Sequence, residues 1–105
     1  MRQIDAPALE AALKDGAQLI DVRQPFEYAE GHVPGARLIP MGQLPSRVSD
    51  LDRNRPVHLI CATGNRSGAM ADFLTAQGFD AVNVAGGTSG WRRSGRSVAT
   101  GTDVA

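Results

Sequence analysis

The single cysteine of the chain lies in a setting that could make it a nucleophile. Cys61 follows the apolar run 57–60 and precedes a segment with a helical pattern. A thiol at the carboxyl end of a strand, followed by a glycine-containing loop and a helix, faces backbone N–H groups and the positive end of a helix dipole. Such groups stabilise a thiolate, which attacks without a separate base. The candidate loop consists of Cys61, Ala62, Thr63, Gly64, Asn65, Arg66 and Ser67.

Charge near this loop supports an anion-binding role. Residues 53–71 contain no acidic side chain but include Arg53, Arg55 and Arg66, so the segment is cationic within a chain of balanced charge. Gly64 allows the positive φ with which a tight loop gathers its N–H groups around an anion. We therefore predict a thiolate at neutral pH. The alternative is a cysteine that only packs as a small buried apolar residue.

Composition indicates one small domain over residues 1–105. Its 105 residues can build a single core, and one cysteine cannot form an internal disulfide, which favours a reducing, cytoplasmic compartment. Eleven basic and eleven acidic residues leave no net charge to attract nucleic acid or a membrane surface. The sequence shows neither a secretion signal nor a membrane-length apolar run. Residues 94–105 are rich in Ser, Gly and Thr and are expected to form a loosely ordered tail.

Short strands alternate with helices along the chain, which predicts an α/β fold with a central parallel β-sheet flanked by helices on both faces. A helix after the loop should end before Gly78, a residue suited to a left-handed helix terminus. Parallel sheets bind ligands at the carboxyl ends of their strands, where Cys61 falls. We predict strands at 18–22, 36–39, 57–60 and 81–84, and further helical segments at 6–15, 25–30, 43–51 and after 86–90.

Three motifs, in order, make the chain resemble the rhodanese family of sulfurtransferases. The candidate loop is similar to the family's Cys-x-x-Gly-x-Arg loop. Residues 21–23 and 27–36 resemble its N-terminal signature, and residues 84–91 resemble its C-terminal one. The resemblance implies a single-domain rhodanese-like fold, with no cofactor, in which the cysteine carries sulfane sulfur as a persulfide.

The resemblance also implies roles for the loop residues. Cys61 would attack the outer sulfur of a small anionic donor such as thiosulfate, the N–H groups of Ala62 through Ser67 would surround the persulfide, and Arg66 would hold the donor or the leaving sulfite. Cyanide or a thiol would then remove the sulfur. Two positions depart from the family pattern: Ala62 replaces a basic residue found in many relatives, and Leu38 replaces a polar one.

Two other functions remain open. Phosphatases and arsenate reductases of related folds also use a cysteine loop, but they place five residues between Cys and Arg, whereas four separate Cys61 from Arg66 here. The shorter loop should form a narrower cradle, which favours a single sulfur atom over a tetrahedral phosphate. The second alternative is a relay that delivers persulfide sulfur to an acceptor protein.

The remaining chemically capable residues are expected to serve structure. Asp21 and Arg23 end a predicted strand, and we expect Arg23 to form an ion pair with Glu27 near the site. His58 should be a hydrogen-bonded core or edge residue.

The last two candidates have local roles in this interpretation. His32 should make hydrogen bonds within its turn, and Trp91 should close the core. Two histidines and one cysteine without ligand spacing do not predict a metal site.

Overall fold

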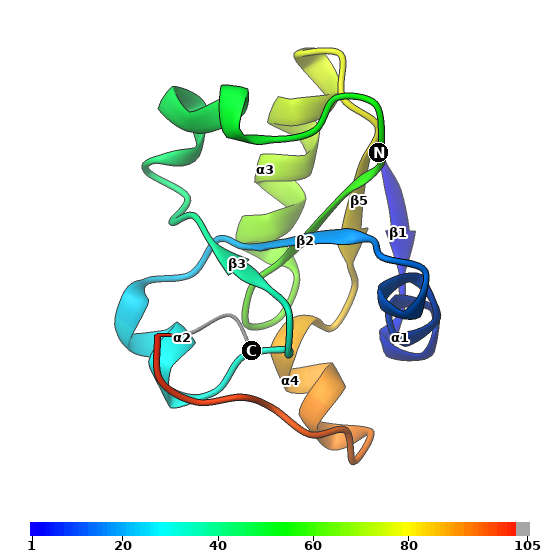
Figure 1. Cartoon of the computed structure of the whole chain (residues 1–105), viewed down its shortest axis with the longest axis vertical. Helices are drawn as coiled ribbons and strands as arrows, with labels where there is room; N and C mark the ends of the chain where they lie inside the picture. Colours follow the sequence, from blue (N-terminus) through cyan, green and yellow to red (C-terminus); the bar gives the residue numbers. More distant parts are fainter. Residues whose placement is uncertain (103–105) are drawn as a thin grey trace.

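The computed structural model describes residues 1–102 and contains a five-stranded parallel sheet with strand order β1-β5-β4-β2-β3 (Figure 1). The strand β4 occupies the centre, between β2 and β5, and all four of its residues are buried. The strands are β1 (Arg2–Ile4), β2 (Gln18–Asp21), β3 (Arg37–Leu38), β4 (Val57–Ile60) and β5 (Ala81–Val84).

Helical segments cover both faces of this sheet, which confirms the predicted fold class. One apolar cluster joins the sheet to the longest helix and to the 3₁₀ segment, and the other joins it to the first, second and last helices. None of the helices described in residues 1–102 is long and apolar enough to cross a membrane. The helical elements are α1 (Ala6–Lys14), α2 (Pro25–Glu30), the 3₁₀ segment η1 (Leu44–Asp50), α3 (Asn65–Ala76) and α4 (Gly87–Arg93).

The alternation of side chains along β4 sets the direction of the cysteine. Successive strand residues point to opposite faces. Leu59 and Cys61 belong to the cluster that contains Leu74 of α3, whereas Ile60 belongs to the cluster that contains Trp91 of α4. The thiol therefore lies on the α3 side of the sheet, beside the start of that helix.

Local signals read from the sequence define several element boundaries correctly. Asp5 caps α1 as predicted, since its carboxylate accepts a hydrogen bond from the N–H of Ala8 at 3.1 Å. At the end of α3, Gly78 has a φ of +90°, and the N–H of Phe79 donates to the carbonyl of Leu74 at 3.0 Å. Phe79 is buried in the core, so this terminus is the predicted glycine stop.

Four elements differ from the sequence prediction. The helix α4 begins at Gly87, inside the turn expected at 86–90. The strand β1 was not predicted, because a three-residue edge strand that is mostly exposed carries no apolar alternation. The helical segment expected at 43–51 is the 3₁₀ segment η1, which is interrupted at Arg47 by a non-helical φ of −122°. Finally, β3 is shorter than the strand expected at 36–39.

The segment that follows α4 returns along the second helix. Ala99 and His32 form an isolated antiparallel bridge through two backbone hydrogen bonds of 2.9 and 2.8 Å, and the N–H of Gly101 donates to Ala29 at 2.9 Å. Trp91 is buried, as predicted, and its indole N–H donates to the carbonyl of Ser97. The loosely ordered tail was predicted for residues 94–105, and of these, residues 103–105 lie outside the described residues.

His58 occupies the middle of the central strand and is less well satisfied than predicted. It is buried between its neighbours Leu19 on β2 and Val82 on β5, and its Nδ1 atom has no hydrogen-bond partner in the described part of the chain. Burial lowers the pKa of His58 below its ordinary value of 6.5, since the charged imidazolium would lose its hydration.

This burial predicts that the protein loses stability as the pH falls. The unfolded chain protonates His58 near pH 6.5, whereas the folded state takes up that proton only at lower pH. Stability is therefore full above the unfolded pKa and declines below it. We expect the free energy of unfolding to decrease between about pH 7.5 and about pH 5.5.

The variant His58→Leu should show a smaller decrease over the same range, as measured by urea denaturation at several pH values. An equal pH dependence in the variant and the wild type would contradict the role assigned to His58.

Candidate active site

The sulfur of Cys61 receives hydrogen bonds from the loop that follows it. The N–H of Gly64 lies 3.1 Å from Sγ, and the hydroxyl oxygen of Ser67 lies 3.3 Å from it. Gly64 has a φ of +108° and forms the N-terminal boundary of α3. The loop thus curls around the thiol as the sequence predicted, with glycine at the position that requires the left-handed conformation.

The surroundings of Cys61 favour the thiolate. Burial raises the pKa of the thiol and is the largest single influence. However, the hydroxyl of Ser67 and the backbone N–H groups of Ser67, Gly64 and Thr63 together outweigh it. The pKa of Cys61 therefore falls below its ordinary value of 9.0. The causes are hydrogen bonds to the charged form, and no basic side chain is among the groups that lower this pKa.

A buried amide orients the serine hydroxyl. Asn83 on β5 accepts a hydrogen bond from the Ser67 hydroxyl through Oδ1 at 2.6 Å, and it donates through Nδ2 to the carbonyl of Gly64 at 3.1 Å. A serine hydroxyl has only one proton, so Asn83 and the sulfur of Cys61 compete for it. Asn83 is not predicted by the loop motif, although a polar residue inside the apolar strand 81–84 is a signal that could have identified it.

The start of α4 holds the carbonyl groups of the loop. Thr88 donates to the carbonyl of Cys61 through its N–H at 2.9 Å and its hydroxyl at 3.1 Å, and the N–H of Ser89 donates to the carbonyl of Ala62 at 3.0 Å. These bonds fix the orientation of the two peptide groups whose carbonyls belong to Cys61 and Ala62. A Cβ atom on Gly87 would lie 2.5 Å from the Cys61 carbonyl oxygen, so the close approach requires glycine.

Arg66 pairs with a glutamate instead of pointing freely toward a substrate. Its two terminal nitrogens donate to the two carboxylate oxygens of Glu27, at 2.7 and 2.9 Å. The hydrogen bonds from Arg66 lower the pKa of Glu27 from 4.5 to about 2, so this carboxylate is charged throughout the physiological range. The pair joins α2 to the start of α3 and leaves the loop less cationic than the sequence suggested.

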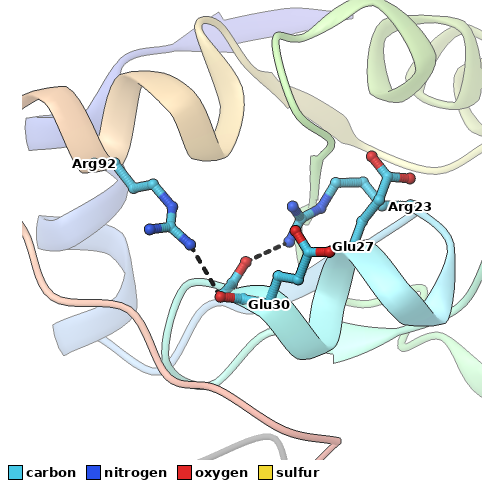
Figure 2. Close-up of a pocket in the computed structure, with 5 residues that line it drawn as sticks. Arg23, Glu27, Glu30 and Arg92 are labelled. Atoms are coloured by element: carbon cyan, nitrogen blue, oxygen red, sulfur yellow. Dashed lines mark hydrogen bonds between the residues drawn. The ribbon is translucent and has the colours of Figure 1, made fainter.

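The expected ion pair between Arg23 and Glu27 is wrong. Arg23 instead forms a buried bidentate ion pair with Asp21, in which Nη2 lies 2.8 Å from Oδ2. Arg23 also donates to the carbonyl of Gly31 at 2.8 Å, and Figure 2 shows this second bond. Asp21 ends β2, so this pair ties the strand to the end of α2. The prediction failed because Glu27 finds its partner 39 positions away, at Arg66.

The other two arginines of the predicted cationic segment lie away from the thiol. Arg55 pairs with Asp52, and Arg53 stacks over Phe79 and donates to the carbonyl of Gln77, beyond the end of α3. Both arginines precede β4, whereas Cys61 follows it. Arg53 and Arg55 are close to Cys61 in sequence but not in space, because the whole length of β4 lies between them and the thiol.

Comparison with known protein families identifies the family of the chain. The model of the rhodanese-like domain matches residues 5–94. The chain belongs to the rhodanese-like family. A sulfurtransferase from Allochromatium vinosum is 36% identical over 98 residues, which span 90% of this chain and 92% of the relative.

Solved structures show that the likeness extends to the whole rhodanese-like fold. A rhodanese-related protein from Thermoplasma volcanium superposes with a TM-score of 0.90 at 35% identity, over 96% of this chain and 100% of the other. A rhodanese-like domain protein from Staphylococcus aureus gives a TM-score of 0.81 at 38% identity, over 87% and 91% of the two chains.

The structure brings three of the six residues predicted to surround the sulfur against it, and the other three have different places. Thr63, Gly64 and Ser67 act on the sulfur, Ala62 is held through its carbonyl, and Asn65 begins α3. His32 makes the expected local bond, from Nδ1 to the carbonyl of Tyr28. Within residues 1–102 no group of three His, Cys, Asp or Glu side chains could hold a metal ion.

The contact between Gly87 and the loop predicts a large cost for an added methyl group. Gly87→Ala places Cβ within 2.6 Å of the carbonyl oxygens of both Cys61 and Ala62, at a φ of +56°. The variant should be destabilised by at least about 3 kcal/mol, which combines left-handed backbone strain with overpacking.

Gly95→Ala is the matched control for this variant. Gly95 has a φ of +82° but no atom within 4 Å of a built Cβ, so the control should lose only about 1–2 kcal/mol. Chemical denaturation measures both changes. Equal losses of stability in the two variants would show that the close approach of Gly87 to the carbonyl groups of Cys61 and Ala62 does not matter for stability.

The hydroxyl of Ser67 predicts a change in the ionisation of the thiol. Ser67→Ala removes a hydrogen bond that lowers the pKa of Cys61, so that pKa should rise. The midpoint of the pH profile for alkylation by iodoacetamide reports this pKa directly, since Cys61 is the only thiol. A midpoint at or below that of the wild type would show that the hydroxyl serves only Asn83.

Proposed function

We propose that this protein is a sulfurtransferase that moves sulfane sulfur from thiosulfate or another small anionic donor, through a persulfide on Cys61, to a thiophilic acceptor such as cyanide or a thiol. The observation that carries the proposal is the sulfur of Cys61 inside its ring of donors, with the N–H of Gly64 at 3.1 Å and a lowered thiol pKa. The relative from Allochromatium vinosum that is named a sulfurtransferase, together with membership in the rhodanese-like family, supports the same class of reaction.

The reaction needs only the thiolate and the donors around it. The Cys61 thiolate attacks the outer sulfur of thiosulfate, the sulfur–sulfur bond of thiosulfate breaks, and sulfite leaves with the electron pair. The acceptor then attacks the outer sulfur of the persulfide, and Cys61 leaves as a thiolate. Two displacements at one residue give ping-pong kinetics. The same N–H groups that stabilise the thiolate stabilise the anionic persulfide.

The geometry of the loop favours a terminal sulfur atom over phosphate. Only 1% of Cys61 is exposed, and just four residues separate it from Arg66. A donor that presents one projecting sulfur can reach such a thiol, whereas a tetrahedral phosphate has to fit several oxygens into the same loop. Arg66 is also engaged by both oxygens of Glu27, so it does not offer a free fork to a phosphate.

The engagement of Arg66 also bears on the identity of the donor. Because Glu27 balances Arg66, a doubly charged donor is bound mainly by backbone N–H groups. A donor that is itself a protein persulfide needs less positive charge around Cys61 for its binding than a doubly charged small donor does. Sulfur relay between proteins is therefore the second form of the proposed function, beside turnover of thiosulfate.

Intact mass spectrometry tests the proposal. Incubation with thiosulfate should add one sulfur atom to the protein, and cyanide should remove it. Cys61→Ser should show no addition, since it lacks the nucleophile, while its circular dichroism should match that of the wild type. Ser49→Cys, at a position outside the loop, is a matched control in the Cys61→Ser background and should not restore the addition.

The outcomes separate the two forms of the proposal. Addition from thiosulfate supports turnover, and addition only from the persulfide of a cysteine desulfurase supports relay. Absence of addition from both donors, or addition that persists in Cys61→Ser, would contradict the function proposed for Cys61.

A further inference from the structure

An open groove of about 610 Å³ lies beside the candidate active site, between α2 and α4. Its lining comes from α4, from α2 with the glycine that ends it, and from Arg23, two positions after β2. Figure 2 shows Arg92 reaching from α4 toward the end of α2. This volume falls within the range of small-molecule sites. The lining residues are Arg23, Glu27, Glu30, Gly31 and Arg92.

Two of the four charges in this groove are already balanced. Arg23 forms a bidentate ion pair with the buried carboxylate of Asp21, and Glu27 forms one with Arg66 of the cysteine loop. Neither side chain needs a ligand to satisfy its charge. Glu27, which lines the groove, is the residue that pairs with Arg66 of the cysteine loop, so this one ion pair connects the groove to the segment after Cys61.

The other two charges face the groove without an ionic partner. Among residues 1–102, no acidic side chain pairs with Arg92 and no basic side chain pairs with Glu30. Arg92 donates to the backbone carbonyl of Glu30 at 3.2 Å, and the carboxylate of Glu30 takes no part in that bond. Within residues 1–102 the groove thus presents one cation without an ionic partner, on α4, and one such anion, on α2.

Gly31 makes room for the arginine. A Cβ atom at this position would lie 1.8 Å from Nη2 of Arg92, so the guanidinium occupies space that any side chain would fill. The backbone of Gly31 is extended, with a φ of 161°, and does not itself require glycine. The reason for glycine here is the close approach of Arg92, which holds that cation at the groove.

We propose that this groove binds the sulfur acceptor, and that the acceptor is a small thiol carrying both a carboxylate and an ammonium group, such as an amino-acid thiol. The carboxylate pairs with Arg92 and the ammonium with Glu30, while the thiol reaches toward Cys61 past the Glu27–Arg66 pair. This inference rests on the sulfurtransferase function proposed above and names the substrate of its second step.

The chemistry of that step balances without a further reactant. The acceptor thiol loses its proton to solvent, and its thiolate attacks the outer sulfur of the Cys61 persulfide. The bond between that sulfur and Sγ breaks, and the electron pair returns to Cys61 as a thiolate. The products are the free enzyme and the persulfide of the acceptor, with no net oxidation or reduction.

A series of four thiols tests the proposal on preloaded protein. Cysteine carries both charges, mercaptopropionate only the carboxylate, cysteamine only the ammonium, and mercaptoethanol neither. Cys61 is first loaded with thiosulfate or inorganic polysulfide, and loading is verified by intact mass. Loss of the added sulfur is then timed with each thiol, and each rate is divided by that for mercaptoethanol on the same variant.

The two charges should affect different thiols. Arg92→Gln should lower the relative rates for cysteine and mercaptopropionate roughly three- to tenfold, and Glu30→Gln should lower those for cysteine and cysteamine by a similar factor. Comparison of each variant with the wild type cancels the different acidities of the thiols. Arg93→Gln on the same helix and Asp72→Asn on α3 are matched controls, since neither side chain lines the groove.

The results separate this proposal from the function on which it rests. If loading succeeds and both variants keep the wild-type preference among the four thiols, the groove is not the acceptor site and the sulfurtransferase function stands. A decrease of the absolute rate by the same factor for all four thiols would also overturn the proposal, because it leaves the relative rates unchanged and indicates a structural effect of the substitution. If no donor loads Cys61, the proposed function fails and the acceptor site fails with it.

Discussion

The site depends most on the hydrogen bonds by which the start of α4 holds the carbonyl groups of the cysteine loop. Thr88 and Ser89 bind the carbonyls of Cys61 and Ala62, and Gly87 lets the two backbones approach. With these carbonyls tied to α4, the N–H groups that follow are left to turn toward the sulfur. Backbone donors fixed before a charge develops need no rearrangement when it forms, which is why this arrangement stabilises an anion effectively.

The parallel sheet makes this interaction possible. Neighbouring parallel strands β4 and β5 end at the same edge, so the loop after one strand meets the turn after the other. Asn83 of β5 adds a second link, because it binds both the hydroxyl of Ser67 and the carbonyl of Gly64. The ion pair between Glu27 and Arg66 closes the remaining side. The loop is therefore held by α4, β5 and α2, and its own side chains carry little positive charge.

The sequence predicted what is local and missed what is long-range. The cysteine loop, the cap at Asp5 and the stop at Gly78 depend on contiguous residues, and the structure contains each of them. The partner of Glu27 could not be found from spacing, since Arg66 lies 39 positions away and Arg23 is nearer in sequence. For the same reason the edge strand β1 was missed, because it pairs with β5, which lies about 80 positions later in the sequence.

Titration of the Cys61 thiolate tests the central claim most directly. Thiolate absorbs in the ultraviolet where thiol does not, Cys61 is the only thiol, and subtraction of the same titration of Cys61→Ser removes the absorbance of tyrosine and the other groups. The folded protein should titrate at a lower pH than the same chain unfolded in denaturant, because the loop N–H groups lower the pKa of Cys61 despite its burial. A folded midpoint at or above the unfolded one would show that burial prevails and that the loop does not prepare a thiolate.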